Sequence, residues 1–251
     1  VYNGTYYEHV VVNKAISLIG KNRSTTVIDG NGTGSVINIT SSYVNVYGFT
    51  IRNGTNGIFI KYSFYNIISG NIVTDNQRGM YLFAYSCPCH APRKNTIVNN
   101  TIKSNSIGIR LEIATENAIY HNNFINNTIQ TYVTTGYANT WDDGYPSGGN
   151  YWSNHVCTGN PNDGSQPYTI DTDNIDHYPF QNPNSWRPST IIGDVNGDGV
   201  VDICDIVIVA IAFGSKPGSP KWNPDADLND DETVDIEDIV LAAINFGAKY
   251  S

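Results

Sequence analysis

The sequence predicts a mainly β protein, a right-handed parallel β-helix followed by a small C-terminal α-helical calcium-binding domain. Three observations predict this fold class. Short apolar runs recur at fixed offsets along the first half of the chain. Two acidic 12-residue segments begin at Asp194 and Asp227, 33 residues apart. Charge divides the chain near the same place: residues 1–190 carry 11 acidic and 11 basic side chains, whereas residues 191–251 carry 12 acidic and three basic ones.

The apolar runs define a repeat in residues 1–138. "VNVYGFTI", "NIISGNIV", "NTIVNNTI" and "NAIYHNNF" start at Val44, Asn66, Asn95 and Asn117, so the offsets are 22, 29 and 22 residues. In three of these units a glycine and an apolar residue follow 13 and 14 residues on, at Gly57–Ile58, Gly79–Met80 and Gly108–Ile109. Short strands repeated every 22 residues are typical of β-helix coils, which bury a continuous core only by stacking.

Two further features fit this prediction. Asparagine recurs at turn positions, where it suits left-handed backbone geometry and can form side-chain ladders between coils. The seven extra residues of the second unit contain "CPCHAPR", which we interpret as an insertion at a turn.

Residues 139–190 form an aromatic, loop-rich segment after the last repeat. Its rings belong to Trp141, Tyr145, Tyr151, Trp152, Tyr168, Tyr178, Phe180 and Trp186. We expect them to close the end of the β-helix as a cap and linker. The alternative interpretation is a row of rings that stacks on sugars.

The body resembles the β-helix family that includes the periplasmic NosD-like proteins and many archaeal surface proteins. The resemblance covers residues 1–180 and is carried by "VYNGTYYEHVVVNKAISLIG", "TTVIDGNG", "VYGFTIRNG" and the stretch from "GGNYWSNH" to "PYTIDTDNIDHYPF". It implies a fold and says little about activity. Members begin with a segment that caps the first coil, whereas this sequence opens inside that coil. We therefore expect end-on self-association or strand donation, giving a fibre or surface lattice.

Each acidic segment offers oxygen ligands at alternate positions of a 12-residue loop, as a hard cation requires. Positions 1, 3, 5, 7, 9 and 12 of the first loop are Asp194, Asn196, Asp198, Val200 (through its carbonyl), Asp202 and Asp205. The same positions of the second loop are Asp227, Asn229, Asp231, Thr233, Asp235 and Asp238. The sequence predicts two Ca²⁺ ions. Gly199 occupies position 6 of the first loop, and Glu232 occupies it in the second, which predicts a strained turn and a weaker site.

An apolar helix is expected after each loop, over residues 206–214 and 239–247, and each ends on glycine. No amphipathic helix precedes either loop, so these are half hands joined by a Pro-rich linker at residues 215–226. This arrangement resembles the type I dockerin domain and covers residues 191–251. The resemblance implies a domain that folds around calcium and docks on a cohesin-type partner.

Partner recognition in this resemblance falls on loop positions 10 and 11. Dockerins often carry hydroxyl residues there, but this chain has Ile203 and Cys204 in the first loop and Ile236 and Glu237 in the second. We therefore expect a cohesin-like domain of unusual specificity or a neighbouring copy of the same chain as the partner.

The cysteines allow two interpretations. We predict a disulfide from Cys157 to Cys87 or Cys89, as in exported proteins. The alternative is a Cys/His metal site that these cysteines form with His90 and His155.

Location and partners follow from composition. The chain has seven Asn-x-Ser/Thr sequons, at Asn3, Asn22, Asn31, Asn38, Asn53, Asn99 and Asn126. With the calcium loops they predict an exported, extracellular or cell-surface glycoprotein. No apolar run is long enough to span a bilayer, and a neutral body with an acidic tail argues against nucleic acid as a partner.

We expect a non-catalytic structural or attachment protein. The body carries few acids, and those at Asp29, Asp75, Glu112 and Glu116 do not recur at one coil position. Arg110 and Glu112 share strand parity, which predicts a surface ion pair. The first alternative is a carbohydrate-active enzyme, a polysaccharide lyase or hydrolase that its dockerin brings to a complex. The second is a periplasmic metal-delivery factor.

Overall fold

The computed structural model describes residues 1–85, 91–136, 138–186, 191–196, 200–229 and 231–249. The chain forms two compact units, Val1–Trp186 and Arg187–Ser251. The aromatic segment predicted as a cap and linker therefore falls with the β-helix in the first unit.

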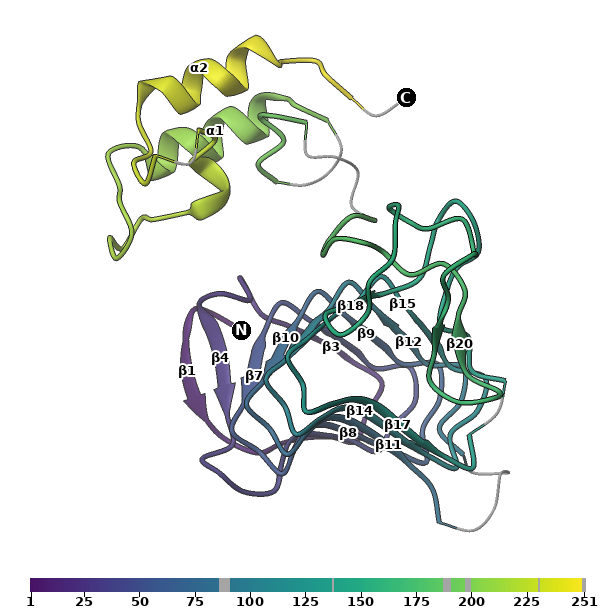
Figure 1. Cartoon of the computed structure of the whole chain (residues 1–251). Helices are drawn as coiled ribbons and strands as arrows, with labels where there is room; N and C mark the ends of the chain where they lie inside the picture. The colour runs from purple at the N-terminus through teal and green to yellow at the C-terminus, as the bar shows by residue number, and fades with distance from the viewer. Residues whose placement is uncertain (86–90, 137, 187–190, 197–199, 230, 250–251) are drawn as a thin grey trace. The chain divides into compact units, whose positions relative to one another are not determined.

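The first unit is a parallel β-helix of three stacked sheets (Figure 1). The seven-stranded sheet contains β1 (Gly4–Tyr7), β4 (Thr26–Asp29), β7 (Thr50–Arg52), β10 (Ile72–Thr74), β13 (Thr101–Lys103), β16 (Asn123–Ile125) and β18 (Tyr151–Trp152). The six-stranded sheet contains β2 (Val10–Val12), β5 (Ser35–Ile39), β8 (Asn56–Lys61), β11 (Arg78–Phe83), β14 (Ile107–Glu112) and β17 (Ile129–Thr134). The five-stranded sheet contains β3 (Ser17–Ile19), β6 (Asn45–Tyr47), β9 (Ile67–Ser69), β12 (Thr96–Val98) and β15 (Ala118–Tyr120).

Strand register confirms the predicted repeat. In the five-stranded sheet Asn45 pairs with Ile67, Ile67 with Thr96, and Thr96 with Ala118, which reproduces the offsets of 22, 29 and 22 residues. Each offset is one coil of the helix. Most of the residues of the predicted insertion, 86–90, lie outside the described part of the chain.

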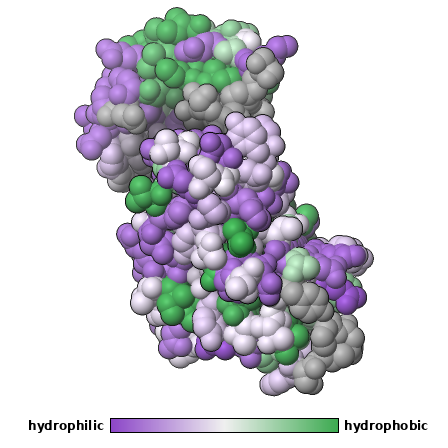
Figure 2. Space-filling model, turned by 45° about the vertical axis from the view of Figure 1, so that its right-hand side comes forward, coloured by the Kyte–Doolittle hydropathy of each residue, from purple (hydrophilic) through white to green (hydrophobic). Residues whose placement is uncertain are grey.

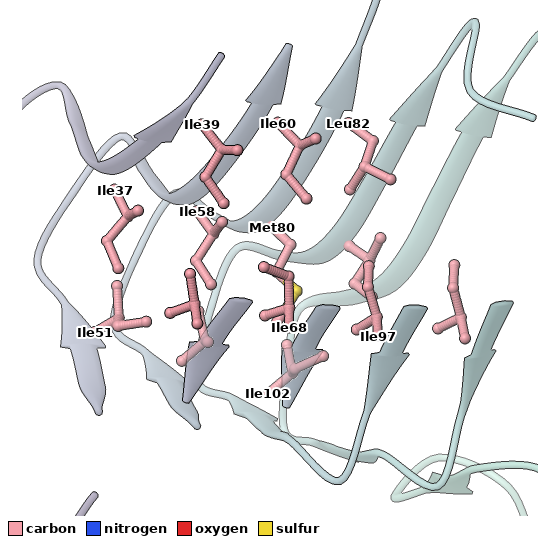
Figure 3. Packing of buried hydrophobic residues seen from close by; sticks show 14 of the residues in the cluster. Ile37, Ile39, Ile51, Ile58, Ile60, Ile68, Met80, Leu82, Ile97 and Ile102 are labelled. Carbon is pink, nitrogen blue, oxygen red and sulfur yellow. The ribbon is translucent and has the colours of Figure 1, made fainter. Parts of the chain in front are cut away.

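The core consists of apolar side chains that lie at equivalent positions of successive coils. Ile37, Ile58, Met80 and Ile109 are register partners on the six-stranded sheet and are fully buried. A second row joins Ile39, Ile60, Leu82 and Leu111, and Figure 3 shows these rows facing the isoleucines of the other sheets. Each coil thus buries its inward face against the neighbouring coils, which explains why the apolar period equals the coil length.

The recurring glycines have a steric cause. A Cβ atom at Gly79 would lie 2.6 Å from the carbonyl oxygen of Gly108 and 2.9 Å from Nδ2 of Asn105. Gly57 and Gly108 are equally close to the coil that follows each of them. Because both neighbours are packed coil backbone or ladder side chains, only glycine fits at the second position of β8, β11 and β14.

Buried asparagines stack between coils as three ladders, as predicted. The first contains Asn66, Asn95, Asn117 and Asn139. The second contains Asn71, Asn100, Asn122 and Asn150, and the third contains Asn76, Asn105 and Asn127. At each link the Oδ1 atom of one asparagine accepts from the backbone N–H of its predecessor, at 3.0–3.1 Å. The ladders satisfy backbone donors at the turns, where strand pairing cannot.

Aromatic side chains cover the last coil. Trp141 and Trp152 are each 1% exposed, and the Trp152 ring stacks on Phe124 at 4.2 Å and on Tyr168 at 4.1 Å. The antiparallel pair β19 (Tyr168–Thr169) and β20 (Ile175–Asp176) holds this cover. Trp141 and Trp152 therefore extend the core, whereas Tyr145 is 64% exposed.

The second unit contains α1 (Ile203–Ala212), the 3-10 helix η2 (Pro224–Ala226) and α2 (Ile236–Ile244). Both α-helices begin three residues earlier than predicted, because Asp202 and Asp235 act as N-caps and start them. The unit has its own small core, made of Val195, Val209, Ala212, Ala226, Val234 and Ala242. None of the helices in the described ranges is long and apolar enough to cross a membrane.

Candidate metal centre and docking surface

The two acidic loops are related by an approximate internal symmetry. Val200, at position 7 of the first loop, pairs antiparallel with Lys249 after α2. Val234, at position 8 of the second loop, pairs antiparallel with Ser215 after α1. Each loop is therefore held by the chain that follows the other helix.

The first loop is organised by Asp205, the residue predicted at position 12. Its Oδ1 atom accepts hydrogen bonds from the N–H groups of Val195 and Asn196, at 2.8 and 2.9 Å. Its Oδ2 atom accepts from the N–H of Asp202 at 2.9 Å. Asp194, Asn196 and Val200 are described parts of this loop, whereas Asp198 and Gly199 lie outside the described residues.

The second loop repeats this arrangement around Asp238. Its Oδ1 atom accepts from the N–H of Leu228 and its Oδ2 atom from the N–H of Asp235, both at 2.7 Å. At position 1, Asp227 accepts from the N–H groups of Asp231 and Glu232, at 3.1 and 2.9 Å. The carboxylate at position 1 therefore stabilises the turn through hydrogen bonds to its backbone N–H groups.

The remaining predicted ligands of the second loop are spread along the turn. Asn229 donates through Nδ2 to Asp231 at 3.0 Å, and Asp231 accepts from the N–H of Thr233 at 2.8 Å. Asp235 accepts from the N–H of Glu237 at 2.8 Å as the helix N-cap. Position 9 thus serves helix capping in both loops.

Glu232 confirms the prediction of a strained turn. It has φ of 65°, in the left-handed region that costs a non-glycine residue about 1 kcal/mol. The carboxylate of Asp227 stabilises this conformation by accepting from the Glu232 N–H. That the second site is the weaker one stays a prediction.

The chemistry of the donor set fits calcium. Asp205 and Asp238 are fully buried, and Asp227 is 9% exposed. The four salt bridges found among the described residues all lie in the first unit, so no described cationic side chain forms a salt bridge with these buried carboxylates. Buried carboxylates require a compensating charge, and oxygen-rich loops provide it by holding Ca²⁺.

The carboxylate oxygens of the two acidic loops do not converge on a single position. Within the residues that the structure describes, no three His, Cys, Asp or Glu side chains group together as a metal site. Their oxygen atoms are turned to backbone N–H groups instead. Each carboxylate has about four lone-pair sites on its two oxygens, so these hydrogen bonds leave sites for a metal.

The helices carry matched apolar side chains on their exposed surface. Ile203 and Ile236 are 61% and 59% exposed, and they occupy the same place in the two halves. Val207 and Val240, Ile211 and Ile244, and Phe213 and Phe246 are further exposed pairs, each 33 residues apart. Figure 2 shows hydrophobic residues gathered on the helical unit. Exposed apolar surface of this size marks an interaction site.

The four residues predicted for partner recognition lie at this surface. Ile203, Cys204, Ile236 and Glu237 are all exposed in the first turns of α1 and α2. The sequence predicted these four residues. It did not predict the exposed apolar residues one and two helical turns later, which are Val207, Ile211, Val240 and Ile244. The signal was present, because every exposed apolar residue of α1 has an apolar counterpart 33 positions later.

The cysteines are only partly described. Cys157 is buried, and its Sγ atom lies 3.6 Å from the carbonyl oxygen of Pro179. Burial raises the pKa of this thiol, so the thiolate needed for metal binding is disfavoured. Cys87, Cys89 and His90 lie outside the described residues. Both the disulfide and the Cys/His site therefore stay predictions.

The four acids considered as catalytic candidates in the body each have a local partner. The Asp29 carboxylate accepts from Nε of Arg52 at 2.8 Å. Burial opposes ionisation of Asp29, but its hydrogen bonds with Asn31, Arg52 and Asn53 outweigh burial and lower its pKa. Among the other acids, Glu112 forms the predicted ion pair with Arg110 at 2.7 Å, Glu116 lies 3.9 Å from Lys94, and Asp75 accepts from Thr74.

None of the seven sequon asparagines is buried. Asn3, Asn22, Asn31, Asn99 and Asn126 are exposed, and Asn38 and Asn53 are partly exposed. Glycosylation stays a prediction.

Comparisons with known proteins agree with this geometry. The family described as "Periplasmic copper-binding protein (NosD)" matches residues 15–160, and "Dockerin type I domain" matches residues 192–242. The "Probable ABC transporter binding protein NosD" of Stutzerimonas stutzeri is 33% identical over 48% of this chain and 29% of its own length. The chain thus matches less than a third of that relative. An alginate lyase from Paenibacillus sp. str. FPU-7 superposes with a TM-score of 0.46 and 14% identity over 55% of each chain.

The fold and the acidic loops define the class: a β-helix protein with a C-terminal dockerin type I domain, which is a calcium-binding domain that docks on cohesin partners. The NosD model covers more than half of the chain, and the chain belongs to the NosD family.

Proposed function

We propose that this chain is an exported, non-catalytic attachment protein. The β-helix is a stiff body, and the dockerin domain, with two calcium ions bound, attaches it to a cohesin-like partner. Calcium supplies the charge that the buried Asp205 and Asp238 carboxylates lack, and it thereby orders the helices that carry the docking surface.

The observation that carries this proposal is the duplicated apolar surface. Ile203, Val207 and Ile211 on α1 have counterparts at Ile236, Val240 and Ile244 on α2. Three exposed apolar residues per helix exceed what a monomeric unit of this size needs, and they support burial by a partner. A role without catalysis is supported by Asp29, Asp75, Glu112 and Glu116, each of which has its own local partner.

The test is calcium-dependent capture of the full chain on an immobilised type I cohesin. We expect capture with Ca²⁺, release by a chelator, and loss of capture in the double variant Ile203→Asp with Ile236→Asp. The matched control is Val156→Asp, a substitution of a 90% exposed apolar residue in the first unit, which should leave capture unchanged.

Two results would contradict the proposal. Sedimentation that shows calcium-dependent polymers, abolished by the same double variant, would make a neighbouring copy the partner. Turnover of a polysaccharide that is abolished by Glu112→Gln would make the body an enzyme.

A further inference from the structure

The outer side of the six-stranded sheet carries rings and cations where a solvated sheet usually carries small polar residues. Its outward side chains on β8, β11, β14 and β17 include Phe59, Lys61, Arg78, Tyr81, Phe83, Arg110, Glu112 and Tyr132, which we call the aromatic–cationic face. These residues are half-buried or exposed, whereas their inward neighbours such as Ile60 and Leu82 are fully buried.

One row of this face is a continuous stack across four coils. Phe59, Tyr81, Arg110 and Tyr132 are successive register partners. The rings of Phe59 and Tyr81 stack with centroids 5.2 Å apart. The guanidinium of Arg110 lies 5.2 Å from the Tyr81 centroid and 5.6 Å from the Tyr132 centroid. The row therefore presents ring, ring, guanidinium and ring at the spacing of the coils.

A second row adds charge. Lys61, Phe83 and Glu112 are register partners, and the Lys61 ammonium lies 5.4 Å from the ring centroid of Tyr85. Arg78 stands on the other side of the first row, 5.2 Å from the Tyr81 centroid. The face thus holds three cations and one anion, whereas residues 1–190 as a whole carry 11 acidic and 11 basic side chains.

The guanidinium groups of Arg78 and Arg110 pack against tyrosine rings, and most of their N–H groups have no acceptor within the described part of the protein. Among the described residues, Arg78 donates only through Nη1 to Asn56, at 3.3 Å, and Arg110 only through Nη2 to Glu112, at 2.7 Å. The Nε atoms of both are buried without an acceptor. The donors that remain for a ligand are therefore on the Nη atoms, whose planar fork matches a carboxylate.

A hydrogen bond to Glu112 fixes the Tyr81 ring within the face. Its hydroxyl donates to Glu112 at 2.7 Å. Burial and the neighbouring carboxylate raise the pKa of Tyr81 to about 12, so the hydroxyl keeps its proton at any ordinary pH. Glu112 therefore links the ring and the guanidinium into one fixed unit.

We propose that the aromatic–cationic face binds an acidic polysaccharide built from uronate sugars. Each uronate unit offers an apolar sugar face for a ring and a carboxylate for a cation. The face offers rings and cations on successive coils, about 4.8 Å apart, so a chain laid across the strands meets both repeatedly. This binding is independent of the docking function proposed above, because it uses different residues on a different unit.

Single-stranded nucleic acid also combines rings and anions, but the observations favour the sugar. Phosphate binding depends on the release of many counterions by a strongly basic surface. The described face has only two net positive charges, on a chain whose formal net charge is −9.

The test titrates the full chain, with Ca²⁺ present, with three polymers. They are polygalacturonate, its methyl ester and single-stranded poly(U). The methyl ester has the same sugar backbone as polygalacturonate but no charge. We expect polygalacturonate to bind, the methyl ester to bind at least about tenfold more weakly, and added salt to weaken binding. The double variant Lys61→Gln with Arg78→Gln and the single variant Tyr132→Ala should each weaken polygalacturonate binding by about tenfold or more.

The matched control is Lys103→Gln, which removes a cation from the outside of the seven-stranded sheet. It should leave binding unchanged. Unfolding curves of all variants should coincide with that of the unaltered chain, since the substituted side chains are at least partly exposed. The proposal is overturned if polygalacturonate does not bind, if Lys103→Gln weakens binding as much as the face variants do, or if poly(U) binds more tightly.

Discussion

At the residue scale, two adjacent residues with different roles form most of the ladder turns of the β-helix. The residue just before a ladder asparagine has a positive φ in every case but Asn150, as in Tyr65 before Asn66 and Lys94 before Asn95. The ladder asparagines themselves do not. The prediction of left-handed geometry at asparagines was therefore only partly right. The left-handed residue bends the chain from one sheet toward the next. The buried asparagine that follows accepts a hydrogen bond from a backbone N–H group of the neighbouring coil.

Asn100 tests the ladders. Its side chain accepts from the N–H of Asn71 and donates to the carbonyl oxygens of Ile68 and Val98. Asn100→Ala leaves these buried groups without partners, and we expect the free energy of unfolding to fall by about 3 kcal/mol. Denaturant unfolding of the first unit measures this loss. The matched control is Asn45→Ala, an exposed asparagine whose loss should cost no more than about 0.5 kcal/mol. Equal effects of the two substitutions would contradict a structural role for the ladder.

Asp176 ends the second ladder with a buried carboxyl group. Its Oδ2 atom accepts from the N–H of Asn150 at 2.7 Å and from Nε1 of Trp152 at 2.8 Å. Burial raises its pKa to about 7 in spite of these donors. Between about pH 4 and pH 7 the folded protein keeps a proton that the unfolded chain has released, so the free energy of unfolding decreases as pH rises through this window and levels off above it.

This pH dependence can be measured through thermal unfolding of the first unit from pH 4 to pH 8. Asp176→Asn keeps an acceptor without the charge and should remove the decline, which amounts to about 4 kcal/mol at most. Asp163→Asn, in the same segment but fully exposed, should leave the decline in place. A profile for Asp176→Asn that still falls between pH 4 and pH 7 would show that another group is responsible.

At the element scale, the two predicted calcium loops differ in the residue at position 6, which is Gly199 in the first loop and Glu232 in the second. Position 6 requires a positive φ, which is readily adopted by glycine. Glu232 adopts φ of 65° in the second loop because the Asp227 carboxylate holds its N–H. On the proposal that the domain folds together with its metal, strain in the folded loop lowers the apparent affinity for calcium.

Glu232→Gly should therefore tighten one of the two calcium sites by about fivefold, because it relieves about 1 kcal/mol of backbone strain. Competition titration against a calcium chelator measures both sites. Glu232→Gln is the control, since it removes the charge and keeps the left-handed side chain, and it should bind calcium no more tightly than the unaltered chain. If both variants tighten the site equally, charge and not backbone geometry sets the difference.

At the scale of the whole molecule, the sequence was informative where a physical constraint repeats. Coil length, strand register and core composition follow from residues such as Ile58 and Met80, which must occupy the same inward position in every coil. The aromatic–cationic face follows the same 22- and 29-residue offsets, from Phe59 to Tyr81 and from Tyr81 to Arg110, but its members differ in chemistry and show no apolar period. Asp176 lies in a segment without any repeat, so its burial could not be predicted.

The two compact units have separate cores, and in the second the buried carboxylates of Asp205 and Asp238 lie in the acidic loops and form no salt bridge with a described cationic side chain. We therefore expect a chelator to unfold α1 and α2 while the β-helix stays folded, so that circular dichroism loses its helical signal and keeps its β-sheet signal. Trp222, the one tryptophan of residues 191–251, packs against the second core and should report this change by fluorescence. In Trp222→Phe the chelator should no longer alter the tryptophan fluorescence, although the helical signal is still lost. Helices that survive chelation would mean that the loops are folded by hydrogen bonds to Asp205 and Asp238 alone, and calcium would then have no part in forming the docking surface.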